Sequence, residues 1–251
     1  MSTHANPTNP FQTTQVATDE QQVIQSALAG DRQSLEFLLG QHQVWIYNIA
    51  FRMVMVPHEA EEVTQEVLIK VITKLATYDP EKASFRTWLY RIVVNHILNM
   101  KRRGVETAIE NFEQYYSFVD AVPDQEPDDS PETELVLTDL KIGCVMGVLL
   151  CLERKQRLVF ILAVGFGVTH TQGSQIMDIS PDDFRKTLSR ARQKLHSHMT
   201  GNCSLVHPGA RCVCRKKVRG FIQSGSYKAD QLMYVQANGQ TLADVVTDSA
   251  R

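Results

Sequence analysis

The stretch Tyr78–Arg103, YDPEKASFRTWLYRIVVNHILNMKRR, sets the pattern for the rest of the chain. It opens with Asp79-Pro80, a dipeptide that favours a turn and keeps the preceding residue out of helix. Ser84 then has the side chain of a helix N-cap. The residues at core spacing after it are Trp88, Leu89, Ile92, Val93, His96, Ile97 and Met100. The stretch therefore predicts a loop followed by one amphipathic helix.

The opposite face of this predicted helix is polar and ends in a basic run. It carries Arg86, Arg91, Asn95 and Asn99, followed by Lys101-Arg102-Arg103. Amides hydrogen-bond to bases and cations bind phosphates, so this face is suited to holding single-stranded or melting DNA. The alternative is a core helix whose basic end simply complements its own dipole.

The residues Phe85, Trp88-Leu89-Tyr90-Arg91-Ile92, Asn95 and Arg102-Arg103 resemble the promoter-melting segment of sigma-70 family factors, in the short extracytoplasmic-function form. The resemblance implies a non-enzymatic sigma factor, which binds core RNA polymerase and directs promoter recognition and DNA melting in transcription initiation. The residues it implies at the −10 element are Tyr78, Lys82, Phe85, Arg86, Arg91, Asn95, Lys101, Arg102 and Arg103.

A helix rich in acids is predicted after Pro57, which breaks the preceding pattern. Glu59, Glu61 and Glu62 fall in its first turn, where acids complement the helix dipole. Its exposed face is a solvated surface in the plainest interpretation. The run Glu59 to Val67, however, is similar to the sigma segment that docks on the clamp helices of polymerase. The implied polymerase-binding residues are Glu59, Glu62, Gln65 and Glu66.

The amino-acid composition limits the number of domains, the mode of DNA binding and the cellular compartment that we expect. The chain has 251 residues, with 43% hydrophobic and 22% charged residues, which is typical of one or two globular domains. Its net charge of −2 indicates that DNA binding is local or assisted by a larger partner. We find no membrane-length apolar run and no secretory signal, so the cytoplasm is the expected compartment, without membrane insertion.

We expect an all-α chain of two small helical domains joined by an acidic linker. Residues 1–17 read as a disordered tail and 18–104 as a domain resembling sigma region 2. Residues 105–134 carry ten acids, and the seven of these between Asp120 and Glu134 are interspersed with three prolines, which predicts an extended linker. In sigma factors the equivalent linker threads through polymerase channels; a plain solubilising spacer is the alternative.

Residues 135–199 resemble sigma region 4. Asp178-Ile179-Ser180 is short enough for the turn of a helix-turn-helix, with Thr169 and Ser180 as caps and Pro181 at a first helical position. The residues expected at the −35 element are Ser180, Arg185, Lys186, Arg190 and Arg192. The chain departs from the family pattern at Gly173, where a buried aliphatic is usual, and at Glu153, where proline is common. Asp182 and Asp183 place acids near the groove-facing end.

Residues 200–251 form a basic, cysteine-rich extension. Cys203, His207, Cys212 and Cys214 are candidate ligands for zinc, or for copper(I), which soft thiolates select. The Cys-x-Cys spacing is tighter than in most zinc sites, so a basic tail with free thiols is the alternative. The surrounding bases are expected to lower the thiol pKa values. Cys144 and Cys151 are expected to be packed core thiols.

Two rival functions remain open from sequence. A metal-responsive helix-turn-helix regulator would bind duplex DNA as a dimer without polymerase, but it leaves the Phe85–Arg103 pattern unexplained. An enzyme would use Cys212 and Cys214 as a redox pair, but no nucleotide-binding loop, zinc-protease motif or nucleophile elbow is present. The expected partners are core RNA polymerase and promoter DNA; an anti-sigma factor is a further candidate.

Overall fold

The computed structural model describes residues 17–127, 130–228, 232 and 234. Every regular element in this part of the chain is a helix, and the only extended pairing described is an isolated parallel bridge between Cys203 and Cys212. The all-α prediction is confirmed. The predicted disordered tail lies, apart from Ala17, outside the described residues. None of the described helices combines the length and apolar character that a membrane span requires.

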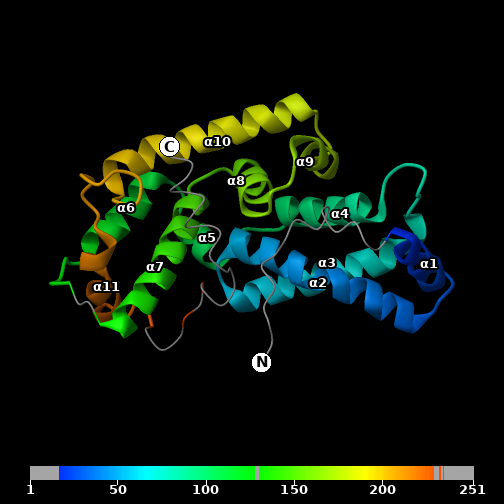
Figure 1. Cartoon of the computed structure of the whole chain (residues 1–251), viewed down its shortest axis with the longest axis horizontal. Coiled ribbons are helices and arrows are strands. Elements are labelled where there is room, and N and C mark those ends of the chain that lie inside the picture. Colours follow the sequence, from blue (N-terminus) through cyan, green and yellow to red (C-terminus); the bar gives the residue numbers. More distant parts are fainter. Residues whose placement is uncertain (1–16, 128–129, 229–231, 233, 235–251) are drawn as a thin grey trace. The chain divides into compact units, whose positions relative to one another are not determined.

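The first compact unit begins with a bundle of helices. They are α1 (Ala17–Leu28), α2 (Arg32–Val54), α3 (Pro57–Lys74), the short 3-10 turn η1 (Leu75–Thr77) and α4 (Phe85–Asn99). As predicted, the Ser84 side chain caps α4 by accepting the backbone N–H of Thr87. Helices α2 and α3 lie side by side and bury the apolar stripes that their sequences show (Figure 1).

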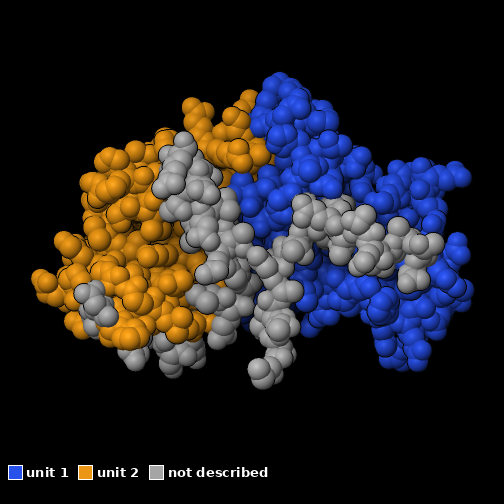
Figure 2. All heavy atoms as spheres, in the orientation of Figure 1, with its two compact units in different colours: residues 1–104, 161–186 blue, residues 105–160, 187–251 orange. Residues whose placement is uncertain are grey.

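The helix-turn-helix contributes to the same unit. Residues 161–186 belong with residues 1–104, and they contain η2 (Ile161–Gly165), α9 (His170–Met177) and the start of α10 (Figure 2). Helix α9 packs on α4, and η2 packs on α2. The predicted 135–199 domain is therefore divided between the two compact units.

The second unit is built around a long apolar helix. Its elements are α5 (Gly104–Ala108), α6 (Phe112–Ala121), α7 (Pro131–Leu150), α8 (Arg154–Phe160), the rest of α10 (Pro181–Asn202) and α11 (Cys214–Gln223). Glu106 is 2% exposed and accepts hydrogen bonds from Arg154 Nε at 2.7 Å and Arg157 Nη1 at 3.0 Å. This buried ion-pair triad ties α5 to α8.

The predicted linker is not extended throughout. It contains α5 (Gly104–Ala108), α6 (Phe112–Ala121) and the start of α7, whereas residues 109–111 and 122–127 lack regular structure. The reason is an apolar pattern at positions i, i+3, i+4 and i+7. Its members, Phe112, Tyr115, Tyr116 and Val119, are all buried. The sequence analysis overlooked this helical pattern because the residues that follow it are rich in proline and acids, which indicated an extended linker.

Candidate polymerase and nucleic-acid interface

Helix α3 presents an exposed acidic face. The side chains of Glu62 and Glu66 are 56% and 43% exposed, and Gln65 is exposed between them. The same face carries two isoleucines that sequence reasoning missed, Ile69 at 60% and Ile72 at 44% exposure. Aliphatic side chains at helical spacing next to these acids were visible in the sequence, but the resemblance was confined to the run Glu59 to Val67.

Glu59 lies apart from this face. Its carboxylate faces Gly104, where an added Cβ would meet Glu59 Oε1 at 2.4 Å. Glu59 Oε2 is buried without a hydrogen-bond partner. Glu59 is therefore a packing neighbour of the turn after α4 in this conformation, and it is less suited to docking than the other three residues.

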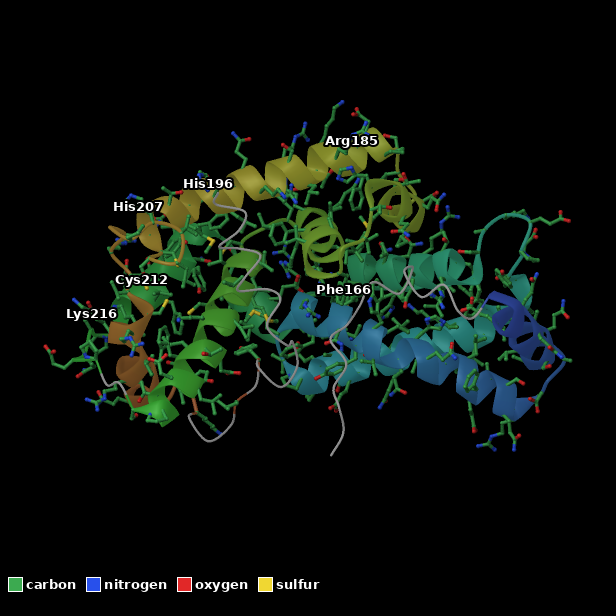
Figure 3. All side chains as sticks on the ribbon, in the orientation of Figure 1. Phe166, Arg185, His196, His207, Cys212 and Lys216 are labelled. Carbon is green, nitrogen blue, oxygen red and sulfur yellow. The ribbon has the colours of Figure 1, made fainter. Side chains whose placement is uncertain are left out.

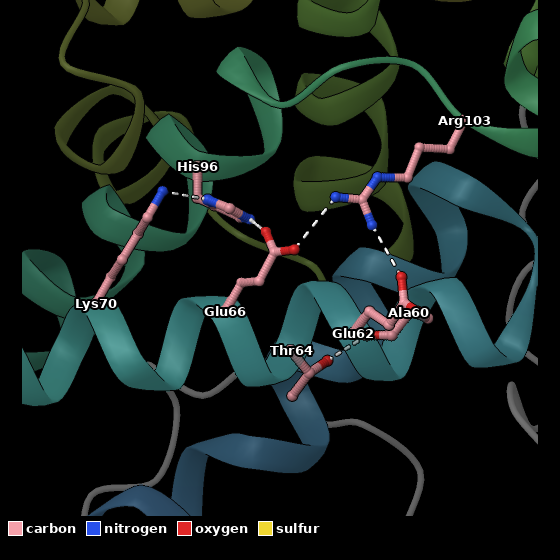
Figure 4. Close-up of polar contacts among 7 residues, drawn as sticks. All are labelled: Ala60, Glu62, Thr64, Glu66, Lys70, His96 and Arg103. Atoms are coloured by element: carbon pink, nitrogen blue, oxygen red, sulfur yellow. Dashed lines mark hydrogen bonds and ion pairs between the residues drawn. The ribbon is translucent and has the colours of Figure 1, made fainter.

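A polar network joins the acidic face of α3 to the basic end of α4 (Figure 4). Arg103 donates to Glu62 Oε2 at 3.0 Å and to Glu66 Oε1 at 3.2 Å. His96 Nε2 lies 3.0 Å from Glu66 Oε2, and its Nδ1 lies 2.6 Å from the Lys70 ammonium. Burial lowers the pKa of His96, and the Lys70 charge lowers it further, so its neutral form is favoured.

A groove of about 820 Å³ runs beside this network. Five of the residues expected at the −10 element line it, namely Arg91, Asn95, Lys101, Arg102 and Arg103. Much of the remaining wall is formed by Lys70, Lys74, Trp88, Ile92, His96 and Asn99. Cations, amides and one indole around an open groove can bind phosphates, base edges and base faces.

The role of Trp88 differs from its sequence interpretation. We expected it on the apolar core face of the helix, but it is half-buried and lines the groove. Its ring also contacts Tyr78 and Phe85, with centroids 5.6 and 5.5 Å away. One face of the indole supports the loop before α4 while part of the ring stays accessible.

Several residues expected at the −10 element lie outside the groove lining. Phe85 was expected to contact the −10 element, but it is only 2% exposed and packs between His42, Tyr78 and Trp88. The physical reason is its position at the first turn of α4, where the loop from η1 folds over it. Arg86 pairs with Glu20 at 3.2 Å, and Lys82 pairs with Asp79 at 3.0 Å.

Arg91 is held by the helix-turn-helix. Its Nε donates to the backbone carbonyl of Gln175 at 2.6 Å, and its Nη2 lies 3.9 Å from Asp178. Both acceptors belong to α9 or its end. In this conformation Arg91 borders the groove while its guanidinium is engaged by another element of the same unit.

The helix-turn-helix is formed as predicted. Thr169 and Gln172 make a reciprocal capping box at the start of α9, which ends at Asp178 in the left-handed region. Ser180 accepts the backbone N–H of Asp183 at 3.0 Å and so caps α10. The glycine at 173 also has an explanation, because an added Cβ would lie 2.3 Å from the fully buried ring of Phe184.

The residues expected at the −35 element are positioned on the surface of α10. Arg185, Lys186, Arg190 and Arg192 are all exposed. Asp182 pairs with Arg185 at 3.3 Å and with Lys186 at 2.7 Å, so its single negative charge offsets part of the charge of the first two cations of the helix. Figure 3 shows Arg185 near the start of this helix.

The tail brings three cysteines together with a fourth from α7. One cavity of about 20 Å³ is lined by all four of them, namely Cys144, Cys203, Cys212 and Cys214. His207 does not line this cavity. Within the described ranges, no set of three or more His, Cys, Asp or Glu side chains is arranged to hold a metal ion. We expected Cys144 to be an ordinary thiol packed in the core. Its position in the sequence did not predict that it lies beside the tail cysteines.

The thiols of this cluster do not share one protonation behaviour. A hydrogen bond from Cys214 lowers the pKa of Cys203 to about 7, and the same bond raises the pKa of Cys214. Burial raises the pKa of Cys212 to about 11. The expectation that nearby bases lower the thiol pKa values is therefore wrong for Cys212 and Cys214, because burial and thiol contacts outweigh those charges.

Comparison with known proteins places this geometry in a family. The model for Sigma-70 region 2 matches residues 38–106, and the model for Sigma-70, region 4 matches residues 142–195. The first match contains α3, α4 and the groove; the second contains the helix-turn-helix. The chain belongs to the sigma-70 family. It is an RNA polymerase sigma factor that directs transcription initiation, and it is not an enzyme.

Several of its relatives are named as extracytoplasmic-function (ECF) sigma factors. It is 27% identical over 172 residues to the ECF RNA polymerase sigma factor SigE of Mycolicibacterium smegmatis, covering 68% of this chain and 63% of that factor. It is 28% identical to the RNA polymerase sigma factor YlaC of Bacillus subtilis, covering 67% of this chain and 94% of YlaC. The helix-turn-helix therefore belongs to a sigma factor. This argues against the rival interpretation, in which the chain is a regulator that binds duplex DNA without polymerase.

A solved structure shares the fold. The structure of CnrH in complex with the cytosolic domain of CnrY has a TM-score of 0.50 and 18% identity, and it covers 71% of this chain and 95% of that chain. The matched region models end at residue 195, so the cysteine-rich tail lies beyond both.

Proposed function

We propose that this sigma factor docks on core RNA polymerase through α3 and holds melted promoter DNA in the groove beside α4. The docking surface is Glu62, Gln65 and Glu66, extended by Ile69 and Ile72. A helix face that mixes exposed acids with exposed aliphatic side chains has the composition of a protein interface. Sigma factors bind core polymerase and promoter DNA, and this surface is the best-suited docking candidate on the chain.

The observation that carries the DNA part is the groove itself. Its cations come from α3, α4 and the run after α4, and Trp88, Asn95 and Asn99 supply a ring face and amide groups. Such a wall fits a single strand, because phosphates meet the cations while unstacked bases meet the ring and amides. Exposed Arg190 and Arg192 on α10 are the stronger candidates for the −35 element, since Asp182 already engages Arg185 and Lys186.

Run-off transcription tests this function. Core RNA polymerase is incubated with a fragmented genomic template, with and without this protein, and start sites are mapped. We expect new transcripts that depend on both the protein and core polymerase. A second reaction contains the chain with Asn95→Ala and Arg102→Ala together, and it should lose those transcripts. Transcripts that are unchanged in the variant would contradict the role of the groove.

We also propose that the tail thiols bind a thiophilic metal ion. Three sulfur atoms of the tail and Cys144 converge on one small cavity, and thiolates select zinc or copper(I). Side-chain rotation is needed to turn these neighbours into a coordinating set. Cys144 is then a better fourth ligand than His207, which does not line the cavity. The factor requires no cofactor for polymerase binding in this proposal, and the metal acts as a signal.

The expected cytoplasmic location and an anti-sigma partner belong to the same proposal. The work of a sigma factor on chromosomal DNA calls for the cytoplasm in a bacterial cell. A protein partner analogous to CnrY for CnrH remains a candidate for this chain, and a pull-down from a cell that expresses it would identify one.

A further inference from the structure

The basic tail faces acidic residues at the end of α6, in the loop that follows it and in the first turn of α7. Arg211 Nη2 lies 3.0 Å from Asp120, Lys217 Nζ lies 3.1 Å from Asp124, and Arg215 contacts the carboxylate of Glu134 directly. The three cations flank or follow the Cys212–Cys214 pair, and the three acids span residues 120–134. We call these three ion pairs the clasp. Figure 3 labels Cys212 and Lys216 within this part of the tail.

The clasp is more than a set of surface charges, because backbone contacts accompany it. The Gln125 N–H donates to the carbonyl of Lys216 at 2.8 Å, and the Lys217 ammonium also donates to the Val122 carbonyl. Lys217 is only 7% exposed and Val122 is 4% exposed. A buried ammonium with two partners fixes its neighbours far more firmly than an exposed ion pair does.

Gly220 shows how closely the two segments approach. A Cβ added at this position would lie 2.4 Å from the Pro123 carbonyl oxygen and 2.7 Å from Val122. Only glycine lets α11 come this near to the segment. The same helix packs on α7. The tail therefore contacts these residues both through ion pairs and through the close approach of the α11 backbone at Gly220.

We propose that the clasp is an inhibitory contact, in which the tail competes with core polymerase for Asp120, Asp124 and Glu134. This inference rests on the proposed function, which makes core polymerase the competing partner. While the clasp is closed, these three carboxylates are paired with tail cations, and the backbone around Pro123 and Gln125 lies against α11. Arg211 precedes Cys212 and Arg215 follows Cys214, so two of the three ion pairs are next to the thiol positions in the sequence.

Limited proteolysis of the full chain tests whether the clasp exists in solution. A protease that cleaves on the amino side of Asp and Glu residues is suited to cutting the Gln125–Glu126 bond, which lies inside the segment that the tail contacts. We expect Lys217→Glu to speed this cleavage by roughly fivefold or more, because the opened segment reaches the protease without global unfolding. Lys216→Glu is the matched control, with the same charge change at an exposed neighbour whose side chain lies outside the clasp. It should leave the rate unchanged.

Two further variants guard against simple misfolding. Arg211→Glu breaks the clasp at a side chain that is 58% exposed, so it should raise the cleavage rate while the thermal midpoint stays close to the parent. Combining Lys217→Glu with Asp124→Lys restores an ion pair and should return the rate toward that of the parent. Equal cleavage of the parent, Arg211→Glu and the Lys217→Glu variant would overturn the clasp.

Run-off transcription then tests inhibition. At limiting protein, Arg211→Glu and Lys217→Glu should each produce several times more transcript than the parent, and Lys216→Glu should match the parent. Faster proteolysis with unchanged or reduced transcript would overturn the inhibitory role while leaving the clasp in place. Failure of the underlying sigma function is distinguishable, since neither the parent nor any variant would then produce a transcript with core polymerase.

Discussion

Arg103 at the basic end of α4 is paired with Glu66 on α3, its Nη2 lying 3.2 Å from Oε1 of the carboxylate. The same guanidinium reaches Glu62 at 3.0 Å. The face proposed for polymerase and the groove proposed for DNA therefore share one network. A polymerase surface that takes over Glu62 and Glu66 would release Arg103 toward the groove, which couples docking to strand binding.

Charge reversal on α3 should weaken docking. Replacing Glu62 and Glu66 together by lysine removes the exposed carboxylates and places two new cations beside Arg103 and Lys70. We expect core polymerase binding to fall by about tenfold or more, with helical content preserved, as measured by co-purification and circular dichroism. The control is Glu110→Lys with Glu113→Lys, the same charge change on exposed residues of the second unit. Retained co-purification of the α3 variant would remove this face from the docking site.

Loss of groove residues should reduce promoter opening. Asn95→Ala and Arg102→Ala each remove an exposed polar side chain, so the fold should tolerate both. Open-complex formation should fall, as shown by weaker permanganate reactivity of unpaired thymines, whereas Arg32→Ala on the 89% exposed side chain in α2 should leave it intact. Trp88→Ala should also reduce opening, since its ring lines the groove. Normal reactivity in all three groove variants would exclude strand holding.

Acid should destabilise the first unit through His42. Burial lowers the pKa of His42 to about 4, with Arg86 adding to the shift, while the Tyr90 hydroxyl contacts Nδ1 at 3.2 Å and Glu20 lies 3.9 Å from Nε2. Because the folded-state pKa is below the unfolded value, the unfolded chain takes up the proton first as pH falls. The contribution of His42 is present above about pH 6.5 and is lost progressively toward pH 4.

A comparison with His42→Phe isolates this effect. The parent should lose up to about 3 kcal/mol more unfolding free energy than the variant between pH 7 and pH 4. Urea denaturation at several pH values measures the difference. Parallel pH profiles for the two proteins would show that His42 is not the titrating group.

Breaking the Glu106 triad should destabilise the second unit strongly. Glu106→Ala leaves Arg154 and the 1% exposed Arg157 without their carboxylate. An uncompensated buried charge costs about 3–5 kcal/mol, so chemical denaturation should show a loss of that size. Glu113→Ala, at an exposed position on α6, should change the unfolding free energy by no more than about 0.5 kcal/mol. A small effect at Glu106 would mean that water replaces the carboxylate.

Elemental analysis should reveal the tail metal. Protein purified under reducing conditions should carry about one zinc or copper ion per chain, and Cys212→Ser with Cys214→Ser should carry none. Cys144→Ser should weaken binding more than His207→Ala, because Cys144 lines the thiol cavity. Affinity should fall as the pH is lowered, since protons compete for the thiolates. A metal-free parent, even after anaerobic reconstitution, would leave a basic tail with ordinary thiols.

Local sequence patterns determined the helix caps, the all-α class and the helix-turn-helix. The caps at Ser84, Thr169 and Ser180 form where the sequence predicts them, because a side-chain oxygen needs only the backbone N–H two or three residues later. The all-α class and the helix-turn-helix follow from such short-range patterns. The resemblance in residues Phe85 to Arg103 was enough to indicate the family.

Tertiary structure decided which of the candidate residues are accessible and what they contact. Phe85 and Trp88 both read as aromatics of one helix, yet folding of the η1 loop buries Phe85 and leaves Trp88 at the groove. Cys144 joins the tail thiols, and the acids of residues 120–134 meet the tail bases, across long separations in sequence. Periodicity assigns a face to each residue of a helix, but burial and charge pairing depend on which distant segment packs against that face.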